Sequence, residues 1–562
     1  MVPGGAGRRG FLRCQTAALN PSPNMLSRLT AFSKIIFALT LLALAGMLAF
    51  WWSTPYGLGL VNDTASYVEG AANLLAGKGF VHISGGGELT PITHFPPLFS
   101  LALAGFGLAG MDLLAGARLL ITFLFGLDII LVGLTIYKIS RSALFALFGA
   151  AVLAFSDVHL GVYSFALSEP LFLTLMLVVF LCLAKSYERR EWYWSVLTGF
   201  FLSLAYLTRY AGVSLFITIL LAAALLPRPL QAPRKESRLL DRSPYREILL
   251  ILSGALPPML AWNLYSLAQT GALSNRLITW HPVPFQVWFE ALKNLLTWAA
   301  PDDLLSHFPL AGRLLSLFSL LLLPGLLSWL VWVISQTHRK TGVQRQGNNQ
   351  SVLAFSLALQ IPVYLGFLVI SLTLFDAATP LNDRILSVIY LPEMILFACG
   401  LAWVWKALSG RVAILRWGIG LFCALFLIFS VKDGLSMVQQ LSTQGQGFAH
   451  QGWQASQTIQ AIQRLPEITL YSNKPTAIYL LTGRSAYNIP TPTDSATGLS
   501  RSSYASDRDL IQQRVQQGEA LLVLFGLRDS QAPDEVLLFK DLSAGLPVLA
   551  DYGDGVIFGI AP

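Results

Sequence analysis

Apolar stretches of about 20 residues recur along this 562-residue chain, and they constrain its fold more than any other feature. Each stretch can cross roughly 30 Å of hydrocarbon as a helix, because a spanning backbone in lipid finds hydrogen-bond partners only in itself. Only 12% of the residues are charged, against about 25% in ordinary soluble domains. The sequence therefore predicts an all-α polytopic membrane protein. The eleven predicted spans are 33–53, 118–137, 143–157, 169–184, 192–208, 210–226, 247–267, 313–335, 351–375, 384–405 and 412–432.

Basic residues lie mainly in short loops between these spans, so the net charge of +8 indicates topology signals and gives no indication of nucleic-acid binding. A twelfth apolar stretch, 95–110, is short, opens with two prolines and contains three glycines. If it is re-entrant or interfacial, most basic clusters fall on the side of the N-terminus, as the positive-inside rule requires. We therefore expect a cytoplasmic N-terminus and an external first loop, 54–118.

The chain divides into three predicted regions: a disordered cytoplasmic N-terminus (1–32), a transmembrane domain (33–434) and an extracytoplasmic α/β domain (435–562). Met25 is an alternative start. The last region changes in composition and shows strand and helix patterns of moderate length. Its expected elements are helices at 451–464 and 508–517, strands at 468–472 and 521–525, and a hairpin at 547–560.

Three short polar motifs stand at the predicted outer ends of the spans, and the first contains Asp63. Asp63 opens an amphipathic stretch, 64–75, that we expect to form a helix along the membrane surface. One interpretation makes it a helix cap, worth about 1 kcal/mol. The other makes it a general base that accepts a proton from a hydroxyl nucleophile.

The second motif places Glu169 between Ser168 and Pro170 at the start of a span. Serine, proline and glutamate at these positions are good capping chemistry for a helix N-terminus. A carboxylate at the bilayer surface is equally suited to bind a sugar hydroxyl, a metal ion or an amine. Position alone does not separate these interpretations.

Two arginines, Arg209 and Arg384, lie at outer helix ends. An arginine in a membrane costs about 2.5–3.5 kcal/mol, so each needs an aqueous interface or an anion. The planar guanidinium suits phosphate. Two arginines on the face that holds both acids favour a phosphate site. The third motif contains His94, beside Pro96 and Pro97, which is either a ligand contact or part of a turn.

The order and spacing of these motifs resemble the GT-C superfamily of membrane glycosyltransferases, of the protein mannosyltransferase and lipid A aminoarabinose transferase type. The motifs that carry the resemblance are Asp63-Thr64-Ala65-Ser66-Tyr67, Ala72 to Phe80, Pro96-Pro97-Leu98-Phe99, Arg118, Ser168-Glu169-Pro170, Thr208-Arg209-Tyr210, Asn382-Asp383-Arg384, Ser472-Asn473-Lys474-Pro475 and Tyr479 to Arg484. Each motif is short, and the specificity lies in their order.

The resemblance implies a GT-C fold and transfer of a sugar from a polyprenyl-phosphate donor to a lipid, glycan or cell-envelope acceptor. It assigns catalysis to Asp63 and Glu169, and the donor phosphate to Arg209 and Arg384. Tyr67 and His94 are expected at the substrate. His94-Phe95 stands where the aminoarabinose enzymes have Glu-Lys, which argues against their substrate.

The sequence also allows other functions. No clear metal-ligand cluster is visible in the sequence, although a divalent metal remains possible. A transporter or flippase of lipid-linked saccharides is the main alternative, but such proteins usually carry ionisable groups near the midplane and repeated halves. Asp128 is the one acid that is clearly mid-span before the loops, and no internal repeat is visible. A non-catalytic scaffold and a lipid-linked glycan polymerase or ligase are further alternatives.

Overall fold

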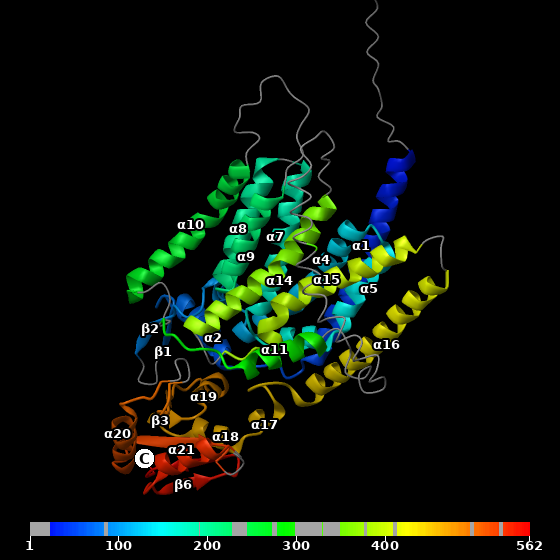
Figure 1. Cartoon of the computed structure of the whole chain (residues 1–562). Helices are drawn as coiled ribbons and strands as arrows, with labels where there is room; N and C mark the ends of the chain where they lie inside the picture. Colours follow the sequence, from blue (N-terminus) through cyan, green and yellow to red (C-terminus); the bar gives the residue numbers. More distant parts are fainter. Residues whose placement is uncertain are drawn as a thin grey trace, which may run out of the picture.

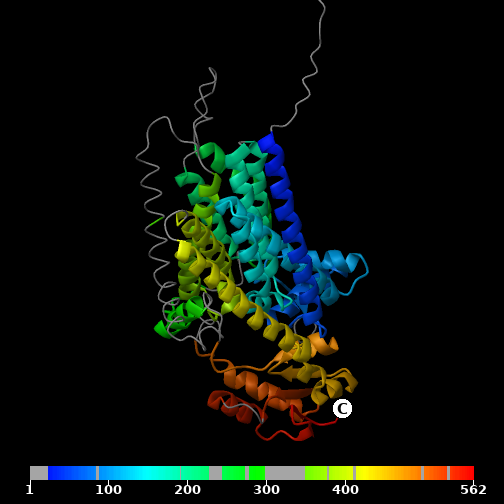
Figure 2. The ribbon, with the colours of Figure 1, turned by 90° about the vertical axis from the view of Figure 1, so that its right-hand side faces the viewer.

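A computed structural model shows a bundle of long helices with a small α/β domain at one end (Figure 1). The structure describes residues 23–83, 88–189, 191–226, 244–271, 278–297, 329, 349–375, 379–408, 413–494, 499–527 and 532–561. The N-terminal end of the first helix lies at the end of the bundle opposite the α/β domain, in both views (Figures 1 and 2).

Seven helices among the described residues are long and apolar enough to cross a membrane. They are α1 (Pro23–Ser53), α4 (Leu113–Ser140), α7 (Glu169–Arg189), α10 (Pro244–Thr270), α14 (Asn349–Leu374), α15 (Asp383–Ala407) and α16 (Ala413–Gln444). Shorter helices complete the bundle: α8 (Trp192–Thr208), α9 (Gly212–Leu225) and α11 (Phe285–Thr297). The predicted multi-pass helical architecture is confirmed. The predicted span 313–335 lies outside the described residues, except for Trp329.

The predicted span 143–157 is followed directly by a second helix. Helix α5 (Ala143–Phe155) and α6 (Asp157–Tyr163) meet at an angle of 56°, and only together could they form one span. Ser156 causes the break, because its Oγ accepts a hydrogen bond from His159 N (3.2 Å) and so caps a new helix. The chain after the predicted span therefore continues as a short helix.

The stretch 95–110 forms α3 (Leu98–Leu108), whose 11 residues span about 16 Å at 1.5 Å per residue. That length is too short to cross about 30 Å of hydrocarbon. The structure thus agrees with the expectation that this stretch does not cross the membrane.

Helices α8 and α10 pack closely together at two glycines. A Cβ built on Gly199 would lie 1.9 Å from Ile251 O, and one on Gly254 would lie 2.2 Å from Val196 O. Small residues let two membrane helices approach until their backbones touch. This contact fixes the helix whose end carries Arg209.

The segment after α1 forms the amphipathic helix α2 (Asn62–Leu75), as predicted, and the short antiparallel strands β1 (Val81–Ile83) and β2 (Leu89–Pro91), which were not expected. Helix α2 buries Tyr67, whose ring contacts Phe95 and Phe99 at 5.1 and 5.0 Å between centroids. The loop is thus folded onto α3.

Backbone pairing joins this loop to two distant segments. Gly59 N donates to Ser164 O (2.7 Å) and Ala166 N donates to Gly59 O (2.9 Å). The carbonyl of Leu60, the residue after Gly59, accepts a hydrogen bond from Phe448 N (2.8 Å). These bonds place the start of α2 beside the start of α7 and beside the entry to the α/β domain.

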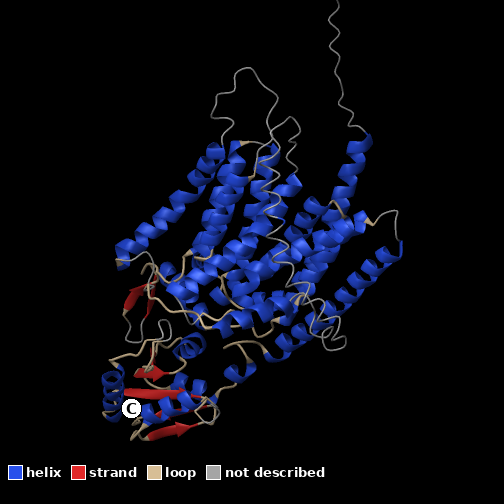
Figure 3. Cartoon of the chain, in the orientation of Figure 1, coloured by secondary structure: helices blue, strands red, loops and turns tan. Residues whose placement is uncertain are grey.

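The C-terminal α/β domain contains a five-stranded sheet of order β4-β3-β5-β7-β6, and most of the strands drawn in Figure 3 lie there. Strands β3, β4 and β5 are parallel, whereas β7 is antiparallel to both β5 and β6. The strands are β3 (Thr469–Ser472), β4 (Tyr487–Asn488), β5 (Ala520–Phe525), β6 (Val548–Asp551) and β7 (Gly555–Phe558). The helices are α17 (Gln451–Gln454), α18 (Gln457–Arg464), α19 (Pro475–Thr482), α20 (Tyr504–Gln516) and α21 (Pro533–Ser543).

The two predicted strands, the helix 508–517 and the hairpin are confirmed, with shifted ends. The single helix expected at 451–464 is wrong, because Ser456 Oγ accepts from Ile459 N (3.0 Å) and starts α18 anew. Helix α16 continues to Gln444, beyond the boundary predicted at 434. Helix α19 packs against α2, so the domain lies over the segment that follows α1.

Candidate functional site

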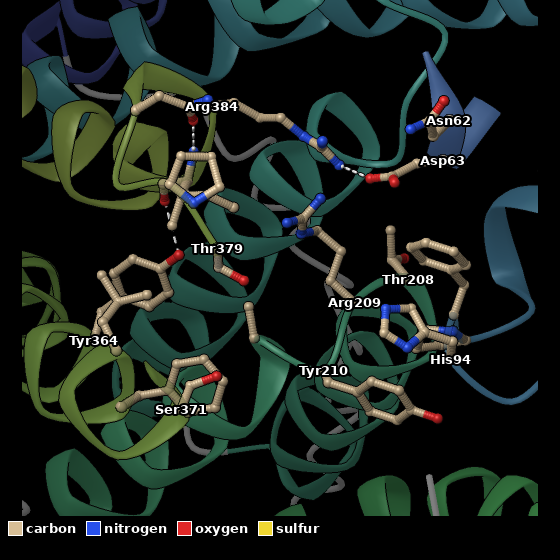
Figure 4. A pocket seen from close by; sticks show the side chains of 18 of the residues that line it. Asn62, Asp63, His94, Thr208, Arg209, Tyr210, Tyr364, Ser371, Thr379 and Arg384 are labelled. Atoms are coloured by element: carbon tan, nitrogen blue, oxygen red, sulfur yellow. Dashed lines mark hydrogen bonds and ion pairs between the residues drawn. The ribbon is translucent and has the colours of Figure 1, made fainter. Parts of the chain in front are cut away.

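Asp63 lies in the first turn of α2, and its carboxylate points toward Arg384 (Figure 4). The polar contact at the start of the helix is made by Thr64, whose Oγ1 accepts from Val61 N (3.1 Å) and donates to Ala166 O (3.2 Å). Asp63 instead pairs with Arg384 Nη2. The capping interpretation therefore describes Thr64 better than Asp63.

Glu169 begins α7 and is 2% exposed. One of its oxygens, Oε1, accepts from Arg209 Nη1 and from Arg384 Nε. Its other oxygen, Oε2, is buried and has no hydrogen-bond partner among the described residues. A single buried carboxylate thus holds two guanidinium groups in place.

The two arginines come from different parts of the chain. Arg209 ends α8 in an extended conformation, just before α9, and Arg384 lies in the first turn of α15. Arg384 bridges Asp63 and Glu169, with Nη2 on the first and Nε on the second. Two acids and two arginines give this cluster a formal charge of zero.

A cavity of about 510 Å³ opens beside this cluster (Figure 4). Asp63, Arg209, Arg384, Tyr67 and His94 all line it, so five of the six residues singled out in the sequence meet there. Glu169 is absent from the lining and lies behind the arginines. The sequence motifs of four separate segments are thus brought together at one end of the bundle.

Tyr67 has a hydroxyl that shares a hydrogen bond of 2.9 Å with Ser168 Oγ, and Arg209 Nη1 approaches the same oxygen at 3.4 Å. Burial raises the pKa of the Tyr67 phenol above its ordinary value. The Tyr67 side chain is therefore a neutral phenol, buried in α2.

Sequence reasoning missed other residues of the cavity wall. Tyr210 donates from its hydroxyl to Thr93 O (2.8 Å) and accepts from Trp262 Nε1 (3.2 Å). Tyr364, in α14, donates to Ile385 O (2.7 Å). Tyr210 follows Arg209 directly, which was a usable signal, whereas nothing in its apolar helix distinguishes Tyr364.

Arg118, a further residue of the motif pattern, does not reach the cluster. Its guanidinium lies 3.8 Å from the centre of the Trp51 ring and donates to Thr54 Oγ1 (3.0 Å) and Trp51 O (2.6 Å). It joins α4 to the end of α1. Among the described residues, no group of three or more His, Cys, Asp or Glu side chains is placed to hold a metal ion.

Comparisons with known proteins show which family and which folds this chain resembles. Residues 83–268 match the family model of dolichyl-phosphate-mannose-protein mannosyltransferases. No match was found among curated protein sequences.

Solved structures with a similar fold include ArnT from Cupriavidus metallidurans bound to undecaprenyl phosphate (TM-score 0.51, 13% identity, 92% of this chain and 97% of that one). The apo state of the same protein matches with a TM-score of 0.50, 13% identity, and coverage of 93% and 97%. An oligosaccharyltransferase from Archaeoglobus fulgidus has a TM-score of 0.48 at 11% identity, covering 89% of this chain and 70% of that one. The family model supports the predicted resemblance to mannosyltransferases over residues 83–268, and the chain is a multi-pass membrane protein whose fold is similar to that of ArnT.

Proposed function

We propose that this protein transfers a sugar from a polyprenyl-phosphate donor to an acceptor hydroxyl on a lipid, glycan or cell-envelope component. The observation that carries the proposal is the Asp63–Arg384–Glu169–Arg209 cluster beside a cavity at a membrane helix end. A polyprenyl phosphate keeps its tail in lipid and its sugar phosphate at the surface, where this cavity lies.

Arg384 and Arg209 bind the donor phosphate in this proposal. A guanidinium presents planar donors to phosphate oxygens and keeps its charge at any physiological pH. Both arginines line the cavity, and both are already held in place by Glu169. Because the donors are fixed before the reaction, they stabilise the negative charge that develops on the leaving phosphate without reorganising.

Asp63 is the proposed general base. It accepts the proton of the acceptor hydroxyl while that oxygen attacks the anomeric carbon and the bond from this carbon to the phosphate oxygen breaks. The electron pair of the broken bond stays on the phosphate oxygen of the leaving polyprenyl phosphate, and the arginines stabilise its negative charge. A single displacement of this kind inverts the anomeric configuration.

Glu169 positions the arginines, and Tyr67 and His94 contact the sugar or the acceptor. Glu169 is buried behind both guanidiniums, so it supports them without reaching the cavity. The site, the first loop and the α/β domain lie at one end of the bundle. We place this end on the extracytoplasmic face, with the N-terminus in the cytoplasm, because the basic loops belong to the other end.

The test is sugar transfer from radiolabelled polyprenyl-phosphate sugars by the purified protein, with a membrane extract as the source of acceptors. Asp63→Asn is expected to lower turnover by about 10²–10⁴-fold, the usual contribution of a general base. Glu88→Gln is the matched control, because Glu88 is an exposed acid in the same loop. Equal turnover of Asp63→Asn and Glu88→Gln would place the base elsewhere. Absence of turnover in the unmutated protein across all donors would favour the transporter or scaffold alternatives.

A further inference from the structure

A second cavity, of about 280 Å³, lies in the C-terminal domain at the carboxyl ends of the parallel strands β3 and β5. From β3 the chain passes to β4 on one side of the sheet, and from β5 it passes to β6 and β7 on the other side. Strand order therefore reverses between β3 and β5. In open α/β sheets, this crevice outside the carboxyl ends of the strands is where ligands bind.

The segment after β3 supplies a lysine to this cavity. Asn473 exchanges two hydrogen bonds with the backbone of Phe525, at 2.9 and 3.0 Å, and Arg484 donates to the carbonyls of Ile462, Leu465 and Pro466. Both side chains hold the domain together. Lys474 is exposed and lines the cavity, and its ammonium has no ion pair with any described residue.

The opposite wall provides an aromatic face, a donor and an acceptor. Trp453 is half-buried, with its ring 5.1 Å from that of Phe525. His450 Nδ1 accepts from Gly452 N (3.0 Å), so the neutral imidazole carries its proton on Nε2 as a donor. Asp554 is exposed but fixed, since it accepts hydrogen bonds from two hydroxyl side chains, one of them Thr458 at 2.7 Å.

We propose that this cavity binds an anionic saccharide, namely the glycan part of the acceptor. The face of Trp453 suits the polarised C–H groups of a sugar ring. His450 and Asp554 offer one donor and one acceptor to sugar hydroxyls, and Lys474 offers a charge to a carboxylate or phosphate on the sugar. The identity of the ligand as acceptor rests on the proposed function, whereas the binding of an acidic saccharide does not.

The position of the cavity fits an acceptor subsite. Phe448, two residues before His450, is hydrogen-bonded to Leu60, three residues before Asp63. At about 3.5 Å or less per residue and about 5 Å across the paired strands, His450 lies within roughly 25 Å of Asp63. On the other side, Lys474 immediately precedes α19, which packs against α2. A glycan of a few sugar units bound in this cavity is therefore long enough to extend to Asp63.

The experiment measures binding by the full-length protein in detergent, carrying Asp63→Asn so that no turnover is required. The probes are a galacturonic acid trisaccharide, a neutral galactose trisaccharide of the same size, and inorganic phosphate. Lys474→Gln is compared with Lys474→Arg, which keeps the charge, and with Lys540→Gln, which removes an exposed lysine of α21. Loss of one charge-assisted hydrogen bond corresponds to about tenfold in affinity.

The expected result is that the acidic trisaccharide binds about tenfold more tightly than the neutral one, and that only Lys474→Gln removes this difference. Equal binding of the two trisaccharides, insensitivity to Lys474→Gln, or no binding at all would overturn the proposal. Phosphate that binds as tightly as the acidic trisaccharide would also overturn it, by indicating a simple anion site. Because no turnover is measured, these outcomes are independent of whether Asp63 is the base.

Discussion

Replacing Glu169 by glutamine is expected to destabilise the protein by about 3 kcal/mol, because the two arginines then face each other without the buried charge between them. Arg209 Nη1 and Arg384 Nε both donate to Glu169 Oε1, so the two nitrogens lie within about 6 Å of each other. Two unit charges at that distance repel by about 3 kcal/mol at an effective dielectric constant of about 20. The result agrees with the cost of about 3–5 kcal/mol for breaking a buried ion pair.

The assay is thermal unfolding in detergent at a fixed scan rate, with and without polyprenyl phosphate. Glu169→Gln should unfold several degrees below the unmutated protein, and polyprenyl phosphate should raise its midpoint more than that of the unmutated protein, since an anion replaces the lost carboxylate. Glu88→Gln controls for the loss of an exposed acid. A Glu169→Gln protein with an unchanged midpoint, or one that polyprenyl phosphate does not stabilise, would refute this account of the arginines.

Three other perturbations have defined outcomes. Asp63→Asn should cost only about 1 kcal/mol, since Asp63 is partly exposed, so its midpoint should stay near that of the unmutated protein while turnover is lost. Burial raises the pKa of Glu69 to about 7. The native protein therefore keeps a proton on Glu69 that the unfolded chain releases near pH 4.5. The free energy of unfolding should fall by at most about 3 kcal/mol as the pH rises from about 4.5 to about 7. Glu69→Gln should abolish that decline between pH 5 and pH 8 in unfolding measurements, and an unchanged decline would contradict the assignment. Gly447→Ala should destabilise the protein more than Gly77→Ala. Both residues have a positive φ, but only at Gly447 would a Cβ lie 2.2 Å from Leu60 O. Equal unfolding midpoints of the two variants would show that this close contact does not affect stability.

The sequence was sufficient for the membrane class, the position of most helices and the residues around the main cavity. Hydrophobic length alone predicts a spanning helix, because the bilayer thickness sets it. Asp63, Arg209 and Arg384 stand out because a charged side chain at a membrane helix end requires an aqueous interface or a partner ion. Their meeting in space rests on the ordered motifs, since no local rule links α2 to α15.

Two helix breaks and the different positions of the two acids were not predictable. The bend between α5 and α6 depends on one serine in an otherwise continuous apolar run, and the same device breaks the helix expected at 451–464. The different positions of Asp63 and Glu169 could not be predicted either, because helix capping explains both acids equally well. Only the structure shows that Asp63 lines the cavity whereas Glu169 lies behind the arginines.

The shared use of Arg384 predicts the order in which substrates act. In the structure Asp63 Oδ2 pairs with Arg384 Nη2, so this oxygen contacts a cation in place of an acceptor hydroxyl. A donor phosphate on Arg384 replaces Asp63 there, at a cost of about 1 kcal/mol for a partly exposed pair, and so releases the base. We therefore expect donor to bind productively before acceptor. Isotope trapping tests this expectation: labelled donor bound first should be converted to product when acceptor is added with excess unlabelled donor, whereas labelled acceptor bound first should be diluted out. Equal trapping from both sides would mean that Asp63 serves the acceptor while still paired, and that the ion pair does not control the reaction.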